Sequence, residues 1–343
     1  MRKRLAILGT GAIGGMLGAY LANAGYDITM ISAFRPETAR LLSQNGISIQ
    51  GPKGDFHVEV SANYIGALKP SEPFDVIFCA LKSNDLLTII PKIKEFLKPD
   101  GCLVTLGNGI NEELITPILG AERVIAGISF AGGQQQDACH FTDHDGSFAI
   151  GELNGAITPR VLEICDILKA ARPSVVSRNI RSLQWQKLGT VSVHVPCCTL
   201  AGVGMQEAFT HPILVKIFPL LAEEVFTVAA ADGCPQETVL GRTREMWMNG
   251  SGPMPTMPAA GGETGGLPPK IVDAYTRDIQ RGAALEIDYT NGAIVRIGKQ
   301  YDIAAPVNED LIRTLREIEA GRAVPGDALC MEFLKRHQPK EEV

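Results

Sequence analysis

Near its start the chain carries six residues whose types and spacing are those of a phosphate-binding turn. The pattern is GxGxxG, here Gly9-Thr10-Gly11-Ala12-Ile13-Gly14. The first glycine of such a turn makes the sharp bend, the second lets the main chain approach a pyrophosphate, and the third lets helix and strand pack closely. Main-chain N–H groups at the start of the following helix then bind the phosphates. The pattern therefore predicts a site for a dinucleotide.

The segment after the next apolar run bears on which dinucleotide is bound. Sites selective for NAD usually place an Asp or Glu there to hold the ribose 2′-hydroxyl. This chain has Ile31-Ser32-Ala33-Phe34-Arg35, with no carboxylate before Glu37. The Ser32 hydroxyl and the Arg35 guanidinium could instead bind a 2′-phosphate through charge-assisted hydrogen bonds. The segment favours NADP(H) over NAD(H), with a solvated Arg35 as the alternative.

The elements that must hold this turn alternate between strands and helices. Residues 5–8 form an apolar run, residues 14–24 a small-residue helix and residues 26–31 a second strand, which together make a strand-helix-strand unit. Right-handed crossover makes such strands parallel. Further strands are expected at residues 76–80, 102–106, 124–128 and 147–151, with an amphipathic helix at 86–97. This succession predicts a Rossmann-type, doubly wound α/β domain.

After about residue 178 the pattern changes to long helical periodicity, which predicts a second, all-α domain. With 343 residues the chain is long enough for two cores. We therefore expect an NADP-binding domain over residues 1–178 and a helical substrate or dimerisation domain over residues 179–343. Residues 249–269 hold two Met-Pro steps and clustered glycines, which suit a surface loop or a lid over an active site.

Composition excludes several classes of partner. The formal net charge is −6 and the basic cluster Arg2 to Arg4 is too short for a nucleic-acid footprint. No apolar run approaches the roughly 18 residues that span a bilayer, so we expect a cytoplasmic protein without a membrane contact.

The eight cysteines lack CxxC spacing and are expected to be reduced, although Cys197 and Cys198 could form a vicinal disulfide. His140 and His144 have i, i+4 spacing, but the neighbouring Asp143, Asp145 and Gly146 indicate a turn and not a helix, so no metal site is expected.

The glycine turn and four further segments together resemble the ketopantoate (2-dehydropantoate) reductase family, and the likeness covers nearly the whole chain. Two lie in the first half after the glycine turn: Ala80-Leu81-Lys82, and Asn108-Gly109 within the run from Leu106 to Glu113. Two more, taken as helical, lie in the second half: Asn179 to Leu188, which includes Trp185-Gln186-Lys187-Leu188, and Glu286-Ile287-Asp288-Tyr289-Thr290-Asn291-Gly292. In this order they are specific to the family.

The resemblance implies that hydride passes from NADPH to a ketone carbon while a lysine protonates the developing alkoxide. Lys187 matches that lysine, and its position between Trp185 and an apolar run suits the partial burial that lowers a lysine pKa. Glu286 matches the family's characteristic acid, suited to orient Lys187 or the cofactor. Asn108 matches an asparagine at a strand's carboxyl end that contacts cofactor and substrate, and Lys82 is placed near the nicotinamide ribose.

Three positions depart from the family pattern, and all three are apolar here. Asparagines four and eight residues after the lysine, which bind the substrate's hydroxyl and carboxylate, correspond to Val191 and Val195. The substrate-binding serine twelve residues before the acid corresponds to Ala274. A site lined by Val and Ala cannot hydrogen-bond a substrate hydroxyl, so the departures favour a 2-keto acid with a more apolar side chain. His194, near Val195, is expected to be a packed helix residue rather than a base.

The leading interpretation is an NADPH-dependent 2-keto acid reductase of this type, acting on a small-molecule substrate. A D-2-hydroxy acid dehydrogenase on the same scaffold is the close alternative, because the apolar substitutions suit it. A non-catalytic NADP(H)-binding sensor is the alternative from another class. Helical second domains in this family often pair, so the resemblance also implies a homodimer.

Overall fold

The structure is a computed structural model that describes residues 3–255 and 272–337. It divides into two units, residues 1–183 and residues 184–343. The first is an α/β domain and the second is built of helices, which confirms the expected fold class. The division falls five residues later than the sequence boundary at 178/179, inside the long helix α6 (Ile180–Ala201).

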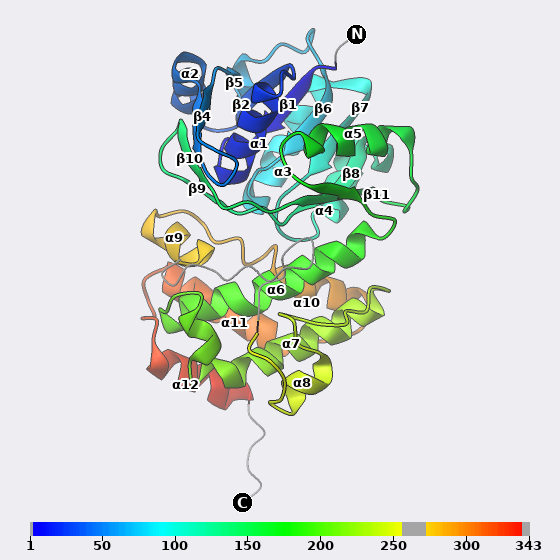
Figure 1. Cartoon of the computed structure of the whole chain (residues 1–343). Helices are drawn as coiled ribbons and strands as arrows, with labels where there is room; N and C mark the ends of the chain where they lie inside the picture. The colour runs from blue at the N-terminus through cyan, green and yellow to red at the C-terminus, as the bar shows by residue number, and fades with distance from the viewer. Residues whose placement is uncertain (1–2, 256–271, 338–343) are drawn as a thin grey trace, which may run out of the picture. The chain divides into compact units, whose positions relative to one another are not determined.

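An eight-stranded sheet forms the first unit, with the strand order β12-β11-β8-β7-β6-β1-β2-β5 (Figure 1). Its strands are β1 (Leu5–Leu8), β2 (Ile28–Ser32), β5 (Ser61–Tyr64), β6 (Phe74–Cys79), β7 (Leu97–Thr105), β8 (Val124–Ser129), β11 (Phe148–Glu152) and β12 (Ser174–Val176). The six strands from β8 to β5 are parallel to their neighbours. Next to these six strands, β11 runs antiparallel to β8. The chain between β8 and β11 passes through two other strands and is not a simple strand-helix-strand unit. The rule that such units have parallel strands and a right-handed crossover therefore does not apply to it.

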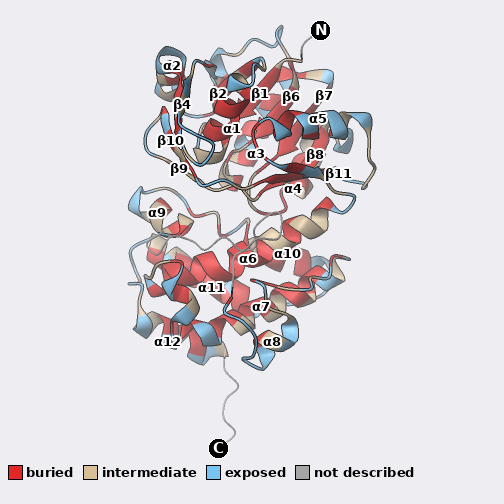
Figure 2. Ribbon diagram, viewed as in Figure 1, coloured by how far each residue is buried: buried red, intermediate tan, exposed pale blue. Residues whose placement is uncertain are grey.

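Helices cover both faces of this sheet. Along β1, Leu5 and Ile7 face a core shared with α1 (Ala12–Asn23) and α5 (Pro159–Lys169). Ala6 and Leu8 face the other core, with α3 (Ser83–Ile93) and α4 (Glu112–Leu119). Successive side chains of a strand point to opposite faces, so a run buried on both sides must be continuously apolar, as β1 is. Figure 2 shows the buried residues concentrated in these central strands. The helix expected at 86–97 is α3, which begins three residues earlier and ends at Ile93.

A second sheet, not expected from the sequence, lies against α1. Its order is β4-β3-β10-β9, and its strands are β3 (Ile47–Gln50), β4 (Phe56–Val58), β9 (Gly133–Gln135) and β10 (His140–Asp143). Helix α2 (Pro36–Asn45) leads into β3. His140 is the first residue of β10, so the expectation that His140 and His144 share a turn is wrong. Among the described residues no group of three His, Cys, Asp or Glu side chains is placed to hold a metal ion.

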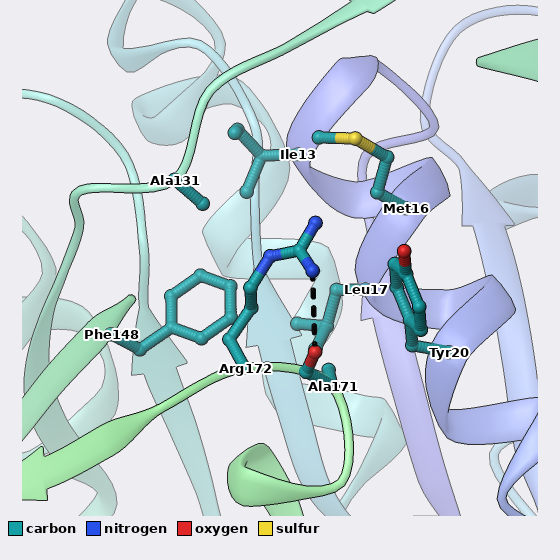
Figure 3. Close-up of a pocket in the computed structure, with 8 residues that line it drawn as sticks. All are labelled: Ile13, Met16, Leu17, Tyr20, Ala131, Phe148, Ala171 and Arg172. Carbon is teal, nitrogen blue, oxygen red and sulfur yellow. Dashed lines mark hydrogen bonds between the residues drawn. The ribbon is translucent and has the colours of Figure 1, made fainter. Parts of the chain in front are cut away.

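A buried ion pair fastens the second sheet to α1. Arg172, 2% exposed, bonds to the Asp143 carboxylate of β10, and the Tyr20 hydroxyl of α1 donates to the same carboxylate at 2.6 Å. Figure 3 shows the Arg172 guanidinium extending between the α1 side chains and Ala131, beside the ring of Phe148. The guanidinium also lies 4.7 Å from the centre of the Tyr20 ring. These contacts hold α1, whose first turn includes the last three residues of the glycine motif.

The second unit consists of α6 and the helices that follow it. These are α7 (Leu214–Ala231), α8 (Arg244–Met248), α9 (Ala274–Gln280), α10 (Asn291–Gln300), α11 (Pro306–Glu319) and α12 (Asp327–His337). No helix of the described residues combines the length and apolar character that crossing a bilayer requires. All eight cysteines are free and buried, Cys197 and Cys198 included. Most of the 249–269 segment lies outside the described residues.

Candidate active site

The glycine turn between β1 and α1 has the local geometry that a bound pyrophosphate needs. Gly9 has a φ of +104°, and a Cβ on it would come 2.8 Å from the carbonyl of Ala80. Gly14 packs so closely that a Cβ there would overlap the Gly9 carbonyl oxygen. At Gly11, by contrast, a Cβ would meet no atom within 4 Å. Two glycines are therefore required by the fold, whereas the space at Gly11 is open to a ligand.

The start of α1 is free to interact with an anion. Gly11 is the N-cap, no side chain caps the helix, and the first turn holds no acidic residue. The first N–H groups of a helix have no partner within the helix and carry a partial positive charge. Gln135 of β9 donates a hydrogen bond from its Nε2 to the Thr10 carbonyl oxygen at 3.1 Å. Gln135 thus orients the turn in which Thr10, Ala12 and Ile13 would present their main chain to phosphates.

The parallel strands bring the other expected cofactor residues of this unit to the same edge. Leu8 of β1 is in register with Cys79 of β6, which is in register with Thr105 of β7. The residues that follow these three ends are the glycine turn, the Ala80-Leu81-Lys82 segment and the loop of Asn108. Lys82 is the N-cap residue of α3. Ligands of open α/β sheets bind outside such carboxyl ends, so this edge is the candidate cofactor site.

Hydrogen bonds to its main-chain carbonyl fix Asn108 in place, so its side-chain amide is available to bind a ligand. Its carbonyl accepts from the Ser83 hydroxyl at 3.0 Å and from Asn111 Nδ2 at 2.7 Å, and Gly109 follows with a φ of +90°. Within the described residues the Asn108 amide group makes no hydrogen bond. Ser83 and Asn111, both buried, were not singled out from the sequence. Their only sequence signal was position. Ser83 directly follows Ala80-Leu81-Lys82, and Asn111 lies just after Asn108-Gly109.

Ser32 is the last residue of β2 and Arg35 follows that strand, next to the glycine turn, because the Gly9 N–H donates to the Ile31 carbonyl at 3.0 Å. Ser32 is buried, and its hydroxyl donates to the Arg35 carbonyl at 2.8 Å. The hydroxyl hydrogen is therefore already used within the loop. Arg35 is exposed, and its guanidinium is the group of this pair that can meet a 2′-phosphate.

In the second unit, Lys187 lies on α6 in surroundings that favour its neutral form. Burial lowers the pKa of the Lys187 ammonium to about 8. Two residues earlier Trp185 is fully buried, and its Nε1 donates to Asp232 at 2.6 Å, which fixes this end of α6 against α7. A lysine with a pKa near neutrality can give up a proton to an alkoxide and be reprotonated from water.

Val191 and Val195 continue the face of Lys187 along α6, and each is less than a tenth exposed. Ala274 is the first residue of α9, directly after the fully buried Asp273, which caps that helix. The Thr199 hydroxyl of α6 donates to Asp273 Oδ1 at 2.8 Å. Thr199 is one turn beyond Val195, so this bond brings the start of α9 to the same stretch of α6. Neither Thr199 nor Asp273 was identified from the sequence.

Glu286 lies in a series of turns before α10, so the expectation of a helix over residues 286–290 is wrong. The N–H of Tyr289 donates to the Glu286 carbonyl at 2.9 Å and closes the turn. Glu286 itself is half-buried. His194 is fully buried and stacks on Phe209 with ring centres 4.2 Å apart. Its Nε2 bonds to the Met205 carbonyl at 2.7 Å, and burial lowers its pKa to about 4, so it is a neutral, packed residue.

Comparison with known proteins identifies the family. Residues 5–155 match the sequence profile of ketopantoate reductase PanE/ApbA, and residues 179–319 match the profile of its C-terminal domain. The chain belongs to the ketopantoate reductase family. The resemblance noted from the glycine turn and the four further segments is thereby confirmed, and the family's two parts correspond to the α/β unit and the helical unit.

Individual relatives align over almost their full length. The 2-dehydropantoate 2-reductase of Archaeoglobus fulgidus is 24% identical over 324 residues, which cover 93% of this chain and 99% of the relative. A PanE/ApbA family ketopantoate reductase from Ralstonia eutropha JMP134 superposes with a TM-score of 0.75 at 24% identity, over 93% of this chain and 99% of that one. D-mandelate dehydrogenase, solved with NADH and anilino(oxo)acetate, has a TM-score of 0.77 at 19% identity, over 97% and 98% of the two chains. Both structures share the fold of this chain.

Proposed function

We propose that this chain reduces a 2-keto acid to the 2-hydroxy acid with NADPH, and that Lys187 is the proton donor. The observation that supports the proposal is that Lys187 is half-buried and desolvation lowers its pKa to about 8, on a helix within the region that matches the family's C-terminal profile. NADPH, when bound, supplies the hydride that forms the new C–H bond at the keto carbon. The carbonyl π bond breaks, and its oxygen takes a proton from Lys187 Nζ to become the hydroxyl.

The remaining residues bind and orient. Gly11 leaves the space for the diphosphate, and the N–H groups of the first turn of α1 bind it. The Asn108 amide and Lys82 are proposed to contact the cofactor, and Asn108 also the substrate. Glu286 is proposed to orient the Lys187 ammonium or the nicotinamide end of the cofactor, because a carboxylate near an ammonium favours its protonated form.

NADPH is proposed over NADH because Arg35 occupies the loop after β2 where NAD-selective sites carry a carboxylate. A guanidinium forms charge-assisted hydrogen bonds with a phosphate and has no equivalent partner on a ribose hydroxyl. The alternative, NADH, has one specific point in its favour: Ser32, the other candidate for the 2′-phosphate, already donates its hydrogen to Arg35.

The substrate is proposed to have an apolar side chain. Val191, Val195 and Ala274 offer only methyl groups at the three positions where the resemblance places polar contacts to the substrate. A substrate hydroxyl placed against them would lose its hydrogen bonds to water without replacement. This favours the second candidate, a D-2-hydroxy acid dehydrogenase acting on branched or aromatic 2-keto acids, over ketopantoate reduction itself.

A substrate panel tests the proposal. Ketopantoate, 2-ketoisovalerate and phenylpyruvate are each assayed with NADPH and with NADH, and kcat/KM is compared. We expect turnover with NADPH and at least a roughly tenfold preference for an apolar substrate over ketopantoate. The variant Val191→Asn/Val195→Asn/Ala274→Ser should reverse that preference. Tight NADPH binding without turnover of any of the three would reject the proposal in favour of a nucleotide sensor.

A further inference from the structure

Helix α6 contains a proline in its interior, at Pro196. Proline has no N–H, so the carbonyl four residues earlier loses its helical donor. That carbonyl belongs to Ser192, which is fully buried. An unpaired buried carbonyl is costly, and such groups nearly always find another partner. The donor for this one must come from outside the helix.

The donor is Asn291, the first residue of α10. Its Nδ2 donates to the Ser192 carbonyl at 2.9 Å and to Asn308 Oδ1 at 2.8 Å, and its side chain is fully buried. Both hydrogens of the amide are therefore used.

The orientation of this amide is determined by a charged group further along. Asn308 Nδ2 donates to Glu224 Oε2 at 2.7 Å, and the N–H groups of Val307 and Asn308 donate to the same carboxylate at 2.8 and 2.9 Å. Since the carboxylate accepts from Asn308 Nδ2, Asn308 must present its Oδ1 toward Asn291. Asn291 can then only donate in that direction. The chain of bonds runs from Glu224 on α7 to the main chain of α6.

The two ends of the Asn291 bond lie on the two segments that carry the proposed catalytic groups. Ser192 is five residues after Lys187 on α6, and Asn291 is five residues after Glu286. The Glu286 turn is closed onto Asn291 by the N–H of Thr290, which donates to the Glu286 carbonyl at 3.2 Å. The buried Tyr275 hydroxyl lies 2.5 Å from Thr290 Oγ1 and supports the same turn.

We propose that Asn291 is a positioning residue: by binding the Ser192 carbonyl that Pro196 frees, it holds the Glu286 turn against the helix of Lys187. The proposal rests on the proposed function for the roles of Lys187 and Glu286, but not for the hydrogen bond. It assigns Pro196 a use as well, since without this proline the Ser192 carbonyl would be satisfied by a helical N–H. Asn291 is fully buried and is not proposed to touch the substrate.

A double-mutant cycle separates positioning from mere satisfaction of the carbonyl. Asn291→Ala should lower the melting temperature by roughly 4 to 8 °C, because two buried acceptors lose their donor. In Asn291→Ala/Pro196→Ala the new N–H at position 196 can pair with Ser192, and at least half of that loss should be regained. Pro219→Ala is the matched control. That proline also lies inside a helix, but the carbonyl it frees belongs to the exposed Val215. Combined with Asn291→Ala, it should give no recovery.

Steady-state kinetics then show whether Asn291 positions the catalytic groups or only stabilises the fold. We expect Asn291→Ala to lower kcat by a factor on the order of 10, with KM for NADPH unchanged, and the double variant to remain slow despite its restored stability. Full kcat in Asn291→Ala, or recovery of kcat together with stability in the double variant, would overturn the proposal. So would the absence of any recovery of stability, because Asn291 would then serve something other than the freed carbonyl.

A readout that needs no turnover keeps this inference separate from the proposed function. The pKa of Lys187 can be measured by its rate of labelling with an amine-reactive anhydride across pH, followed by mass spectrometry. It should be about 8 in the native chain and should shift in both Asn291 variants, because the desolvation of the ammonium and its distance from the Glu286 carboxylate both depend on how the turn is held. If the native chain reduces no 2-keto acid, the proposed function fails. An unchanged Lys187 pKa in the variants would then independently reject the positioning role.

Discussion

Gly14 packs against Gly9 so tightly that a methyl group on Gly14 would overlap the Gly9 carbonyl oxygen. Two residues of one motif are thus required by the packing of the turn itself. Gly11, between them in sequence, meets no such restriction. The motif therefore has a structural part and a binding part, which substitutions can separate.

Gly11→Val should weaken NADPH binding without unfolding the protein. The new side chain projects into space that no protein atom occupies, so we expect a melting temperature within a few degrees of the native value. It occupies the approach of the diphosphate, so the dissociation constant for NADPH should rise by a factor on the order of 10 or more. Gly14→Ala is the contrasting variant and should lose stability. Native affinity in Gly11→Val, measured by fluorescence titration, would place the cofactor elsewhere.

Arg35→Ala should reduce selectivity for NADPH. If the guanidinium binds the 2′-phosphate, kcat/KM with NADPH should fall by a factor on the order of 10 while the value with NADH is unchanged. Arg40→Ala is the control, because Arg40 is exposed on the same segment but is paired with Glu37. Equal losses with both cofactors would show that Arg35 holds the loop and does not read the phosphate.

Lys187→Met should abolish reduction and leave the fold intact. The loss of kcat should reach a factor on the order of 100 or more, as expected for removal of a general acid. In the native chain kcat for reduction should fall as the pH rises through about 8, because the donor must be protonated. Burial lowers this pKa, so the folded state disfavours the ammonium. Stability should therefore rise, not fall, as the pH increases from about 8 toward the ordinary lysine pKa of 10.5. A pH profile flat from 7 to 10 would contradict the assignment.

Asp143→Asn should destabilise the first unit. Removing the carboxylate leaves the buried guanidinium of Arg172 with only the exposed Asp145 carboxylate, 3.7 Å away, and breaking a buried ion pair typically costs about 3 to 5 kcal/mol. Burial by itself raises the pKa of the Asp143 carboxyl. The hydrogen bonds from Tyr20 and Arg172 lower it by more, so the pKa lies below the ordinary value of 3.8. The pair therefore stabilises the fold above that pH, and the contribution is lost as the pH falls through the folded pKa.

Urea unfolding of both proteins at pH 7 and pH 3 measures this effect. The difference between native and Asp143→Asn proteins should shrink at the lower pH. Glu317→Gln serves as the surface control, since Glu317 pairs with Arg322 in solvent and its loss should hardly change the stability. If Asp143→Asn costs no more than Glu317→Gln, the buried pair does not hold the second sheet to α1.

The amino-acid sequence by itself determined those features that depend on short spacing. The glycine turn, the continuous apolar run of β1 and the successive strands of the central sheet follow from local backbone geometry and from burial on both faces. The resemblance also brought Lys187 and Glu286 into consideration, through motifs only a few residues long.

Tertiary structure decided what depends on residues far apart in the chain. Strand β9 is Gly133-Gln134-Gln135, with no apolar alternation, and it exists because β10 pairs with it. The antiparallel β11 likewise follows from pairing with β8, and the turn at Glu286 from bonds that end the helix pattern before α10. The link between Asn291 and Ser192 spans 99 positions. A freed carbonyl can be read from Pro196 alone, but its donor is chosen by three-dimensional packing, which local spacing does not encode.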